Sequence, residues 1–363
     1  MTLFEAVVLG AGPGGLATMA SLLDGGLHSI LWIDRTFEGG RLNQLYREIS
    51  SNTKTGIYLD TIRSSSTCTR IIAKAPKPNA ITRLEEIDRE ETWLDGVHKV
   101  VGEVEEAKFE DSNWTLETPS GESITTGRFF LCTGSYPTPA HFHEKYNLKL
   151  GILDLDRCMV RSTLPSLFPK DRPSTIAVIG NSHSGILVCR NLYEAAQSGD
   201  RDLRIVNFRR RPIKYAEYRE DGIVFDNTGL KGTTADWAKQ VMEQNADSSI
   251  VLEQIDLNDD PDSVYRKHLP RCTHIVYAIG YTPSPLPRLF VGGRRIDQEL
   301  EFVMHTSGFR IRGKREMVQG LFGCGIAFPE KVEDPDGHVE AAVGVGKFFK
   351  FAERVKGDWV AVR

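Results

Sequence analysis

The chain lacks the features that mark several broad classes of protein. Its six cysteines include no Cys-x-x-Cys pair, which argues against a dithiol redox motif and a zinc knuckle. No apolar run is long enough to span a bilayer. The formal net charge of −4 provides no general basic surface. We therefore expect no metal site, no nucleic-acid partner and no membrane partner.

Targeting and disulfide signals are also sparse. The first residues carry no basic leader and glycines interrupt their apolar run, so we expect no signal peptide. Single, scattered thiols are typical of a reducing compartment, and we expect a cytoplasmic protein. With 363 residues, 40% of them apolar, the chain is long enough for about two globular domains.

A glycine-rich turn lies near the start of the sequence. An apolar run at residues 6–9 leads into Gly10, Gly12 and Gly15, and a helix-like run follows. The first glycine of such a turn permits a tight bend, the second lets the backbone approach a pyrophosphate, and the third lets helix and strand pack closely. A second strand-like run ends at Asp34, about 20 residues later, where a ribose-binding acid is expected.

A second, altered version of this turn occupies residues 177–192. Gly180 and Gly185 keep their places, but Ser182 replaces the middle glycine. A serine adds only a small side chain, and its hydroxyl can donate a hydrogen bond to a phosphate. The sequence therefore predicts a second dinucleotide site.

Three arginines indicate which dinucleotide the second turn takes. The strand-like run at residues 203–208 ends in Arg209, Arg210 and Arg211, where NAD enzymes carry an acid. A guanidinium suits the 2′-phosphate of NADPH, so we favour NADPH. The alternative is a solvated basic run without a ligand.

Further motifs resemble a known group of enzymes. These are the Gly39-Gly40-Arg41-Leu42 stretch after Asp34, the SSNTK stretch at residues 50–54, and Thr133-Gly134 after a strand. With them the chain resembles the FAD-dependent oxidoreductases with two dinucleotide-binding domains, above all flavin-containing monooxygenases and lysine/ornithine N-hydroxylases. The resemblance implies an α/β fold with two Rossmann-like domains. A three-layer ββα FAD domain at 1–160 and 281–363 would be interrupted by an NADPH domain at 161–280.

The resemblance also implies a set of site residues, with Asn52 as the catalytic candidate; the alternative for Asn52 is a turn cap. The FAD-binding candidates are Gly10, Gly12, Pro13, Gly14, Gly15, Asp34, Arg35, Gly40, Arg41, Leu42, Thr133, Gly134 and Gly325. The NADPH-binding candidates are Gly180, Asn181, Ser182, His183, Ser184, Gly185, Arg209, Arg210 and Arg211. A residue in such a turn more often packs or caps than acts as an acid or base, so we do not assign His183 a catalytic role. Cys132 and Cys324 are expected to be structural.

Two departures from the family pattern weaken the expected grip on FAD. Only residues 81–97 offer a helix between the flavin loop and the following strands, and Gly325 is followed by Ile326 instead of an acid. A third segment, Phe225-Asp226-Asn227, is loosely similar to a loop of the N-hydroxylases; its alternative is a solvent-exposed loop.

The resemblance implies a single-component monooxygenase. NADPH would reduce FAD, molecular oxygen would react with the reduced flavin, and one oxygen atom would pass to an amine, sulfur or carbon centre of a small molecule. Two alternatives stay open: a flavin reductase or oxidase without oxygen insertion, and a non-redox nucleotide-binding or flavin-scaffold protein. A homo-oligomer also stays open.

Overall fold

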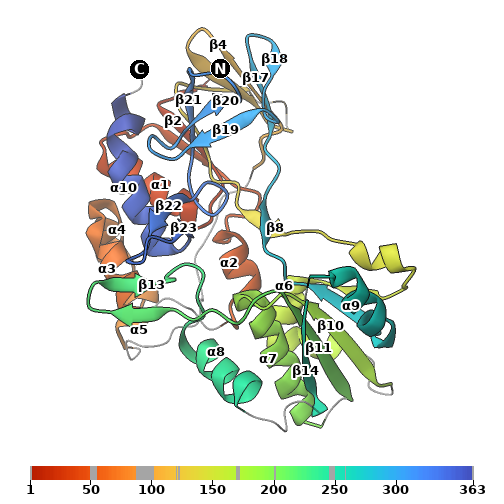
Figure 1. Cartoon of the computed structure of the whole chain (residues 1–363). Helices are drawn as coiled ribbons and strands as arrows, with labels where there is room; N and C mark the ends of the chain where they lie inside the picture. Colours follow the sequence, from red (N-terminus) through yellow and green to blue (C-terminus); the bar gives the residue numbers. More distant parts are fainter. Residues whose placement is uncertain are drawn as a thin grey trace.

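Two sheets organise the chain, and each contains the strand that leads into one glycine turn (Figure 1). The computed structural model describes residues 2–49, 55–86, 102–119, 121, 123–168, 172–199, 202–244, 250–257 and 259–361. In Figure 1 the half that carries the first turn lies above the half that carries the second.

The first sheet has a parallel centre and an antiparallel edge. Its strands, in spatial order, are β19 (Leu300–Val303), β20 (Gly308–Ile311), β21 (Met317–Gly323), β7 (Phe129–Leu131), β2 (Ala6–Leu9) and β3 (Ile30–Ile33). Apolar side chains on β2 alternate between two cores: Val7 packs in one, and Ala6 and Val8 pack in the other. Both faces of this sheet are therefore covered.

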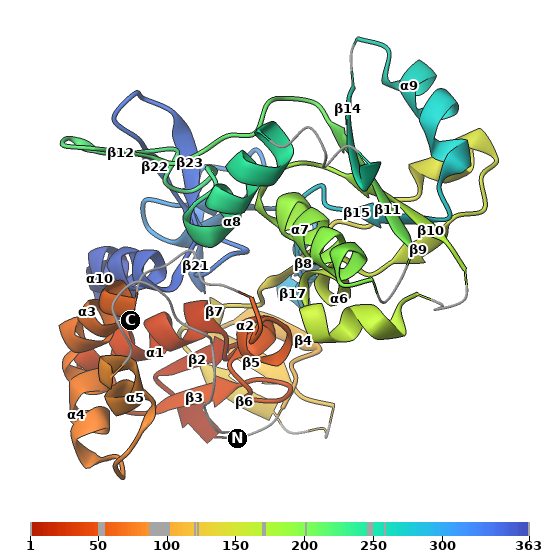
Figure 2. The same ribbon diagram turned by 90° about the horizontal axis from the view of Figure 1, so that it is seen from below.

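A second sheet covers one of those faces around buried Trp114. Its strands, in spatial order, are β1 (Thr2–Phe4), β6 (Ser123–Thr126), β5 (Asn113–Glu117), β4 (Glu106–Glu110), β17 (Arg288–Val291) and β18 (Arg294–Arg295). Helices α1 (Pro13–Asp24) and α10 (Val345–Ala361) cover the other face (Figure 2). The expected three-layer ββα arrangement is thereby confirmed.

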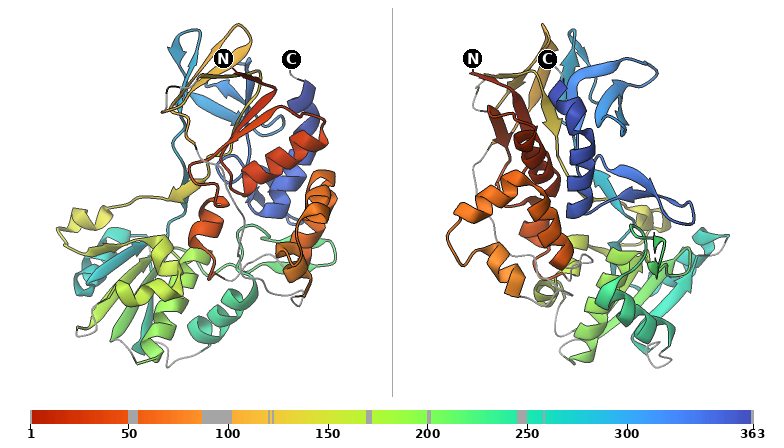
Figure 3. Two further views of the ribbon diagram at one scale, coloured as in Figure 1. Left: turned by 180° about the vertical axis from the view of Figure 1, so that it is seen from behind. Right: turned by 90° about the vertical axis from the view of Figure 1, so that its left-hand side faces the viewer.

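The two covering helices run in the same direction (Figure 3). A Cβ on Gly25, which follows α1, would lie 2.9 Å from Val360, so the carboxyl ends of the helices meet. Both helix N-termini therefore face the carboxyl edge of the parallel strands, where ligands bind in open α/β sheets.

The lower half holds a five-stranded parallel sheet with helices on both faces. Its strands, in spatial order, are β14 (Leu252–Asp256), β11 (Leu203–Arg209), β10 (Ser174–Ile179), β15 (His274–Tyr277) and β9 (Gly151–Leu153). Strand β9 precedes the predicted NADPH-domain boundary at residue 161, yet it pairs with β15. The bounds 161–280 stay a prediction.

The described residues also form three two-stranded ribbons. They are β8 (Ser135–Pro137) with β16 (Tyr281–Pro283), β12 (Glu217–Arg219) with β13 (Gly222–Val224), and β22 (Glu330–Glu333) with β23 (Val339–Ala342). In the first ribbon, the chain leaves the upper half through β8 and returns through β16, and these strands pair antiparallel.

The remaining helices fill the layers and connections. They are α2 (Gly40–Leu45), α3 (Thr55–Ser64), α4 (Ser66–Lys74), α5 (Ala80–Glu86), α6 (Leu155–Met159), α7 (His183–Gln197), α8 (Gly232–Trp237) and α9 (Pro261–His268). Short 3₁₀ turns span Phe142–Tyr146, Arg161–Ser166 and Leu269–Arg271, and a π-helical turn spans Ala238–Glu243. No helix within the described ranges has the length and apolar character needed to cross a bilayer.

Helices α3 and α4 correct one sequence expectation. We expected residues 81–97 to be the only helix in this region, and that was wrong, because α3 and α4 precede it. Ser65 caps α4 by accepting a hydrogen bond from the Cys68 amide. Asp24, at the end of α1, accepts bonds from the hydroxyls of Ser65 and Ser66 and from the Thr67 amide. Residues 87–97 lie outside the described part of the chain.

Arg128 stabilises the carboxyl end of α10 in the upper half. Its guanidinium donates to the carbonyls of Trp359 and Val360, at 2.8 and 3.0 Å, and so satisfies the carboxyl end of α10. We predict that Arg128→Met, which keeps the apolar stem, lowers the free energy of unfolding by about 1.5–3 kcal/mol. Urea unfolding followed by tryptophan fluorescence measures this.

The matched control is Arg310→Met, which removes a surface ion pair with Glu301. That pair should contribute less than about 1 kcal/mol. Equal losses in both variants would contradict a capping role for Arg128.

Candidate functional site

The two glycine turns have nearly the same backbone. Gly10 has φ +109° and Gly180 has φ +114°, a region that favours glycine. A Cβ on Gly10 would lie 2.2 Å from the Cys132 carbonyl oxygen, and one on Gly180 would lie 2.3 Å from that of Ala278. The first glycine of each turn therefore packs against the backbone at the end of the neighbouring strand, and a side chain there would clash with it.

The last glycines of the two turns are equally constrained. A Cβ on Gly15 would lie 1.8 Å from the Gly10 carbonyl oxygen, and one on Gly185 would lie 2.4 Å from that of Gly180. Each helix thus packs directly on its strand, as the spacing of the motif predicts.

A side chain on the neighbouring strand donates a hydrogen bond to the first glycine of each turn. Trp32 Nε1 on β3 donates to the Gly10 carbonyl at 2.8 Å, and Asn207 Nδ2 on β11 donates to the Gly180 carbonyl at 2.8 Å. Both residues pair with the valine two positions before the glycine, Val8 or Val178. Neither residue was expected from the sequence; the asparagine within an apolar strand was the available signal, because a buried polar side chain needs a hydrogen-bond partner.

The helix N-termini above both turns are open. The residue before each helix is Gly12 (φ −77°, ψ −174°) or Ser182 (φ −84°, ψ −174°), and neither helix has a side-chain cap. This backbone is extended and accepts any residue, which explains why a serine can replace the glycine. Uncapped N–H groups and the positive end of the helix dipole make each position suitable for a phosphate.

The first turn has space on its outer side. Among the described residues beyond its chain neighbours, a Cβ on Gly12 would have only the Gly40 Cα within 4 Å, at 3.9 Å. Pro13 occupies the first helical position, where its missing N–H costs nothing. On the inner side, a Cβ on Gly14 would lie 2.7 Å from the Cα of Gly325, which has φ +98°. Gly325 therefore packs against the turn.

Asp34 lies at the end of β3, and its carboxylate hydrogen-bonds the backbone of the first turn. Its carboxylate accepts hydrogen bonds from the amides of Ala11 (2.7 Å), Thr36 (2.9 Å) and Phe37 (2.8 Å). Arg35 points away and pairs with Glu103 at 2.9 Å, with 80% of its side chain exposed.

The surroundings of the first turn fit FAD. The Thr133 hydroxyl is buried and has no hydrogen-bond partner within the described residues, and Gly134 beside it has φ +73°. Three large apolar side chains are about 40% exposed near this edge: Leu16 in the first turn of α1, Ile326 after Gly325, and Val343 before α10. Open space at Gly12 suits a pyrophosphate, and exposed apolar groups suit a flavin ring.

The three arginines after β11 separate into two kinds. Arg209 is engaged: it donates to Asp256 at 2.6 Å and to Gln254 at 2.8 Å. Arg210 and Arg211 are exposed and make no ion pair with another described residue. The Asn181 side chain donates to the Arg211 carbonyl at 2.6 Å and so holds this segment beside the second turn.

The other second-turn residues have distinct surroundings. Burial lowers the pKa of His183 to about 4, so this imidazole is neutral at pH 7. Ser184 lies near Tyr281 at the return crossing. Burial raises the pKa of the Tyr281 hydroxyl, and Ser184 acts against this larger effect by lowering that pKa.

Two further FAD candidates lie on α2, between the halves of the molecule (Figure 1). Leu42 is half-buried, and Arg41 forms an ion pair with Asp156 of α6. Asn52, the catalytic candidate, lies outside the described residues and stays a prediction. Burial raises the pKa of Cys132 and that of Cys324, the latter to about 12, so both thiols are protonated at pH 7.

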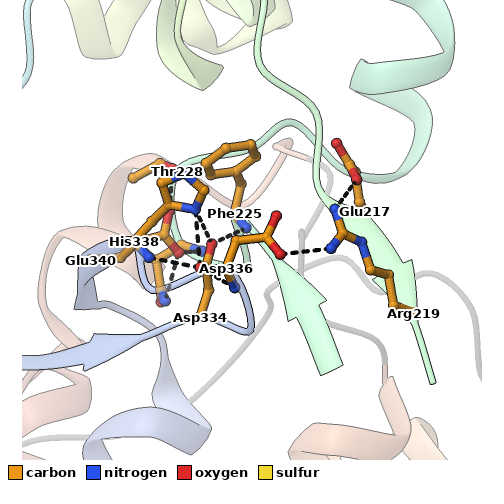
Figure 4. A network of polar contacts seen from close by, with 9 residues as sticks. Glu217, Arg219, Phe225, Thr228, Asp334, Asp336, His338 and Glu340 are labelled. Carbon is orange, nitrogen blue, oxygen red and sulfur yellow. Dashed lines mark hydrogen bonds and ion pairs between the residues drawn. The ribbon is translucent and has the colours of Figure 1, made fainter. Parts of the chain in front are cut away.

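The Phe225-Asp226-Asn227 segment of the lower half packs on the upper half, and Figure 4 shows the contacts of Phe225. The Phe225 amide donates to Asp334 at 3.0 Å, and the Asn227 amide donates to Glu340 at 2.9 Å. Lys347, in the first turn of α10, forms an ion pair with Asp226 at 2.5 Å. We call this contact of residues 217–231 with residues 330–347 the clasp.

Aromatic and charged groups extend the clasp. The Phe225 ring lies 4.5 Å from the His338 ring, and Arg219 bonds Asp336 at 2.7 Å, as Figure 4 shows. The alternative of a solvent-exposed loop is wrong, because Phe225, Asp226 and Asn227 are partly buried against the upper half. The similarity of this segment to the N-hydroxylase loop stays a prediction. The β22–β23 hairpin that receives it had no recognised signal in the sequence.

Comparison with known proteins places this geometry in a family. The family model for pyridine nucleotide-disulphide oxidoreductases matches residues 4–304. The monooxygenase AgnR1 of Paecilomyces divaricatus is 37% identical over 387 residues, covering 98% of each chain.

Solved structures share the fold at low identity. A flavin-containing monooxygenase from Stenotrophomonas maltophilia matches with a TM-score of 0.56 and 12% identity, over 99% of both chains. The bacillithiol disulfide reductase Bdr (YpdA) of Bacillus cereus matches with a TM-score of 0.54 and 12% identity, over 100% of both chains. The chain therefore belongs to the pyridine nucleotide-disulphide oxidoreductase family, and it is an FAD-dependent oxidoreductase.

Proposed function

We propose that this FAD-dependent monooxygenase draws its electrons from NADPH, with FAD on the first turn and NADPH on the second. One observation carries the assignment: two turns of the same backbone are followed by opposite charges. Asp34 follows β3, the strand beside the first turn. The exposed Arg210 and Arg211 follow β11, the strand beside the second turn. An acid suits ribose hydroxyls, whereas guanidinium groups suit a 2′-phosphate.

The residues around the first turn would hold FAD along its length. The N-terminus of α1 would receive the pyrophosphate, Asp34 the ribose, and the apolar edge near Ile326 and Val343 the ring. When bound, FAD supplies hydride acceptance from NADPH and activation of molecular oxygen.

The protein itself supplies binding, orientation and exclusion of water. The N-terminus of α10 adds a positive dipole end at the edge where the ring would lie. The clasp contacts the first turn of α10 through Lys347, and in Figure 1 its β22–β23 hairpin lies on the side away from β8. Together these features favour transfer to a bound small molecule over loss to solvent. A cytoplasmic location is part of this proposal.

A reductase or oxidase of the same fold differs in the fate of oxygen. Incubation with NADPH, ¹⁸O₂ and a panel of amines and thioethers separates the two functions. A monooxygenase gives ¹⁸O-labelled product, whereas an oxidase gives only peroxide, in amounts that match the NADPH consumed.

Gly12→Ala tests the FAD assignment without disturbing the fold. Apart from its chain neighbours, its methyl group would meet no described residue closer than 3.9 Å, but it would occupy the space left for the pyrophosphate. We predict that the protein without cofactor keeps its melting temperature while its affinity for FAD falls about ten-fold or more. Calorimetric titration with FAD measures the affinity.

Gly357→Ala on α10 is the matched control, because its methyl group also enters open space. It should bind FAD normally and be slightly more stable. Normal FAD binding by Gly12→Ala would remove the first turn from the FAD site.

A double substitution tests the NADPH assignment. Arg210→Ala with Arg211→Ala should raise the KM for NADPH about ten-fold or more and leave the KM for NADH nearly unchanged, because only NADPH carries the 2′-phosphate. Steady-state oxidation of both nucleotides gives the ratio. Arg204→Ala, an exposed arginine on the same strand, is the control. Equal increases for both nucleotides would contradict the assignment.

A further inference from the structure

A buried carboxylate lies between the two nucleotide-binding turns. Asp156 on α6 is only 4% exposed. It accepts hydrogen bonds from the Tyr46 hydroxyl at 2.6 Å and the Tyr281 hydroxyl at 3.4 Å, and it forms an ion pair with Arg41. The two tyrosine hydroxyls also lie 3.2 Å apart. We call these four residues the Asp156 junction.

The members of the junction come from three separate segments. Arg41 and Tyr46 lie on and just after α2 in the upper half, and Asp156 lies on α6 in the lower half. Tyr281 is the first residue of β16, where the chain returns to the upper half. Tyr46 also packs against the apolar core of the lower half. The junction thus joins both halves at the crossing.

The junction contacts the first turn and the helix that follows the second turn. At one end, Gly40 precedes Arg41, and a Cβ on Gly40 would lie 2.9 Å from the Cα of Gly12 in the first turn. At the other end, Tyr281 packs against the apolar core of the lower half, which includes Ile186 and Leu187 of α7, the helix that follows the second turn. A series of contacts therefore connects the first turn, through Asp156, to the helix of the second turn.

The buried Asp156 carboxylate depends on its hydrogen-bond partners. An ionised carboxylate that loses a buried partner is destabilised by several kcal/mol, so the arrangement with Tyr46, Tyr281 and Arg41 is strongly favoured. Burial also raises the pKa of Tyr281, which keeps its hydroxyl protonated and able to donate. The contacts that hold Asp156 accordingly fix the relative placement of α2, α6 and β16.

We propose that the Asp156 junction sets the spacing of the two turns, and that Tyr46, Asp156 and Tyr281 are positioning residues for hydride transfer from NADPH to FAD. This inference rests on the proposed function. In the step concerned, a C–H bond of the nicotinamide breaks, its electron pair leaves with the hydrogen, and FAD is reduced as NADPH becomes NADP⁺. The rate of such a step falls steeply when the reacting groups are misplaced by about 1 Å.

The test compares two tyrosines whose hydroxyls donate to carboxylates at the same distance. Tyr46 donates to Asp156 at 2.6 Å across the junction, and Tyr146 donates to Asp262 at 2.6 Å within the lower half alone. Each is replaced by phenylalanine in the FAD-loaded protein. Anaerobic stopped-flow absorbance then gives the flavin reduction rate at saturating NADPH and the NADPH concentration for half-maximal rate.

We expect Tyr46→Phe to slow flavin reduction about ten-fold, with less than about a two-fold change in the half-saturating NADPH concentration. Tyr146→Phe should reduce at the wild-type rate. Tyr281→Phe, whose contacts are longer, should give a smaller loss and serves if Tyr46→Phe does not fold. Equal reduction rates in wild type and the junction variants would overturn the inference, even if the variants melt at lower temperature.

A second measurement needs no turnover. Hydrogen exchange in the protein without NADPH should become faster at residues 40–49 and 281–284 in Tyr46→Phe, and stay unchanged there in Tyr146→Phe. Unchanged exchange in both would overturn the fastening role. If NADPH fails to reduce the wild type itself, the proposed function fails, and the exchange measurement still decides whether the junction holds the two turns.

Discussion

The site depends on one close backbone approach in each half. The helix after each turn packs so tightly on the strand before it that a single methyl group at Gly15 or Gly185 would overlap a carbonyl oxygen. This contact aims the helix N-terminus at the carboxyl edge of the sheet. It leaves the first N–H groups without intrahelical partners and therefore available to an anion. Everything else in the site is arranged around those two points.

Because the turns are alike, they do not by themselves distinguish one dinucleotide from another. The distinction lies at the ends of the following strands, and there the equivalent residues are Asp34 and Arg209. Asp34 uses its carboxylate to organise the turn, whereas Arg209 is bound to Asp256 on the neighbouring strand. The charges that face solvent beside the second turn therefore belong to the next two arginines.

The sequence predicted the parts of the fold that follow local rules. Glycine spacing after apolar strands identified both turns, and the alternation of apolar residues reflects sheets covered on two faces. It did not reveal which polar groups meet across the chain. Arg41, expected at FAD, pairs with Asp156, and Trp32 and Asn207 support the turns. Helices α3 and α4 were missed because the run of serines and threonines at residues 64–67 resembles a loop. The Asp24 carboxylate that binds the start of α4 lies about 40 residues earlier in the sequence.

The antiparallel pairing of β8 with β16 has a consequence for how this chain is assembled. Thr138 and Thr282 approach within 2.9 Å between their hydroxyl oxygens, although most of the lower half lies between them in the sequence. A segment whose two ends adjoin behaves as an insertion: it can be gained, exchanged or lost without redirecting the host chain. The upper half, by contrast, pairs β7 with β21 across that insertion. This pairing carries a large loop-closure entropy cost unless the inserted segment is already compact. Early folding of the lower half would thus bring the separated strands of the upper half together.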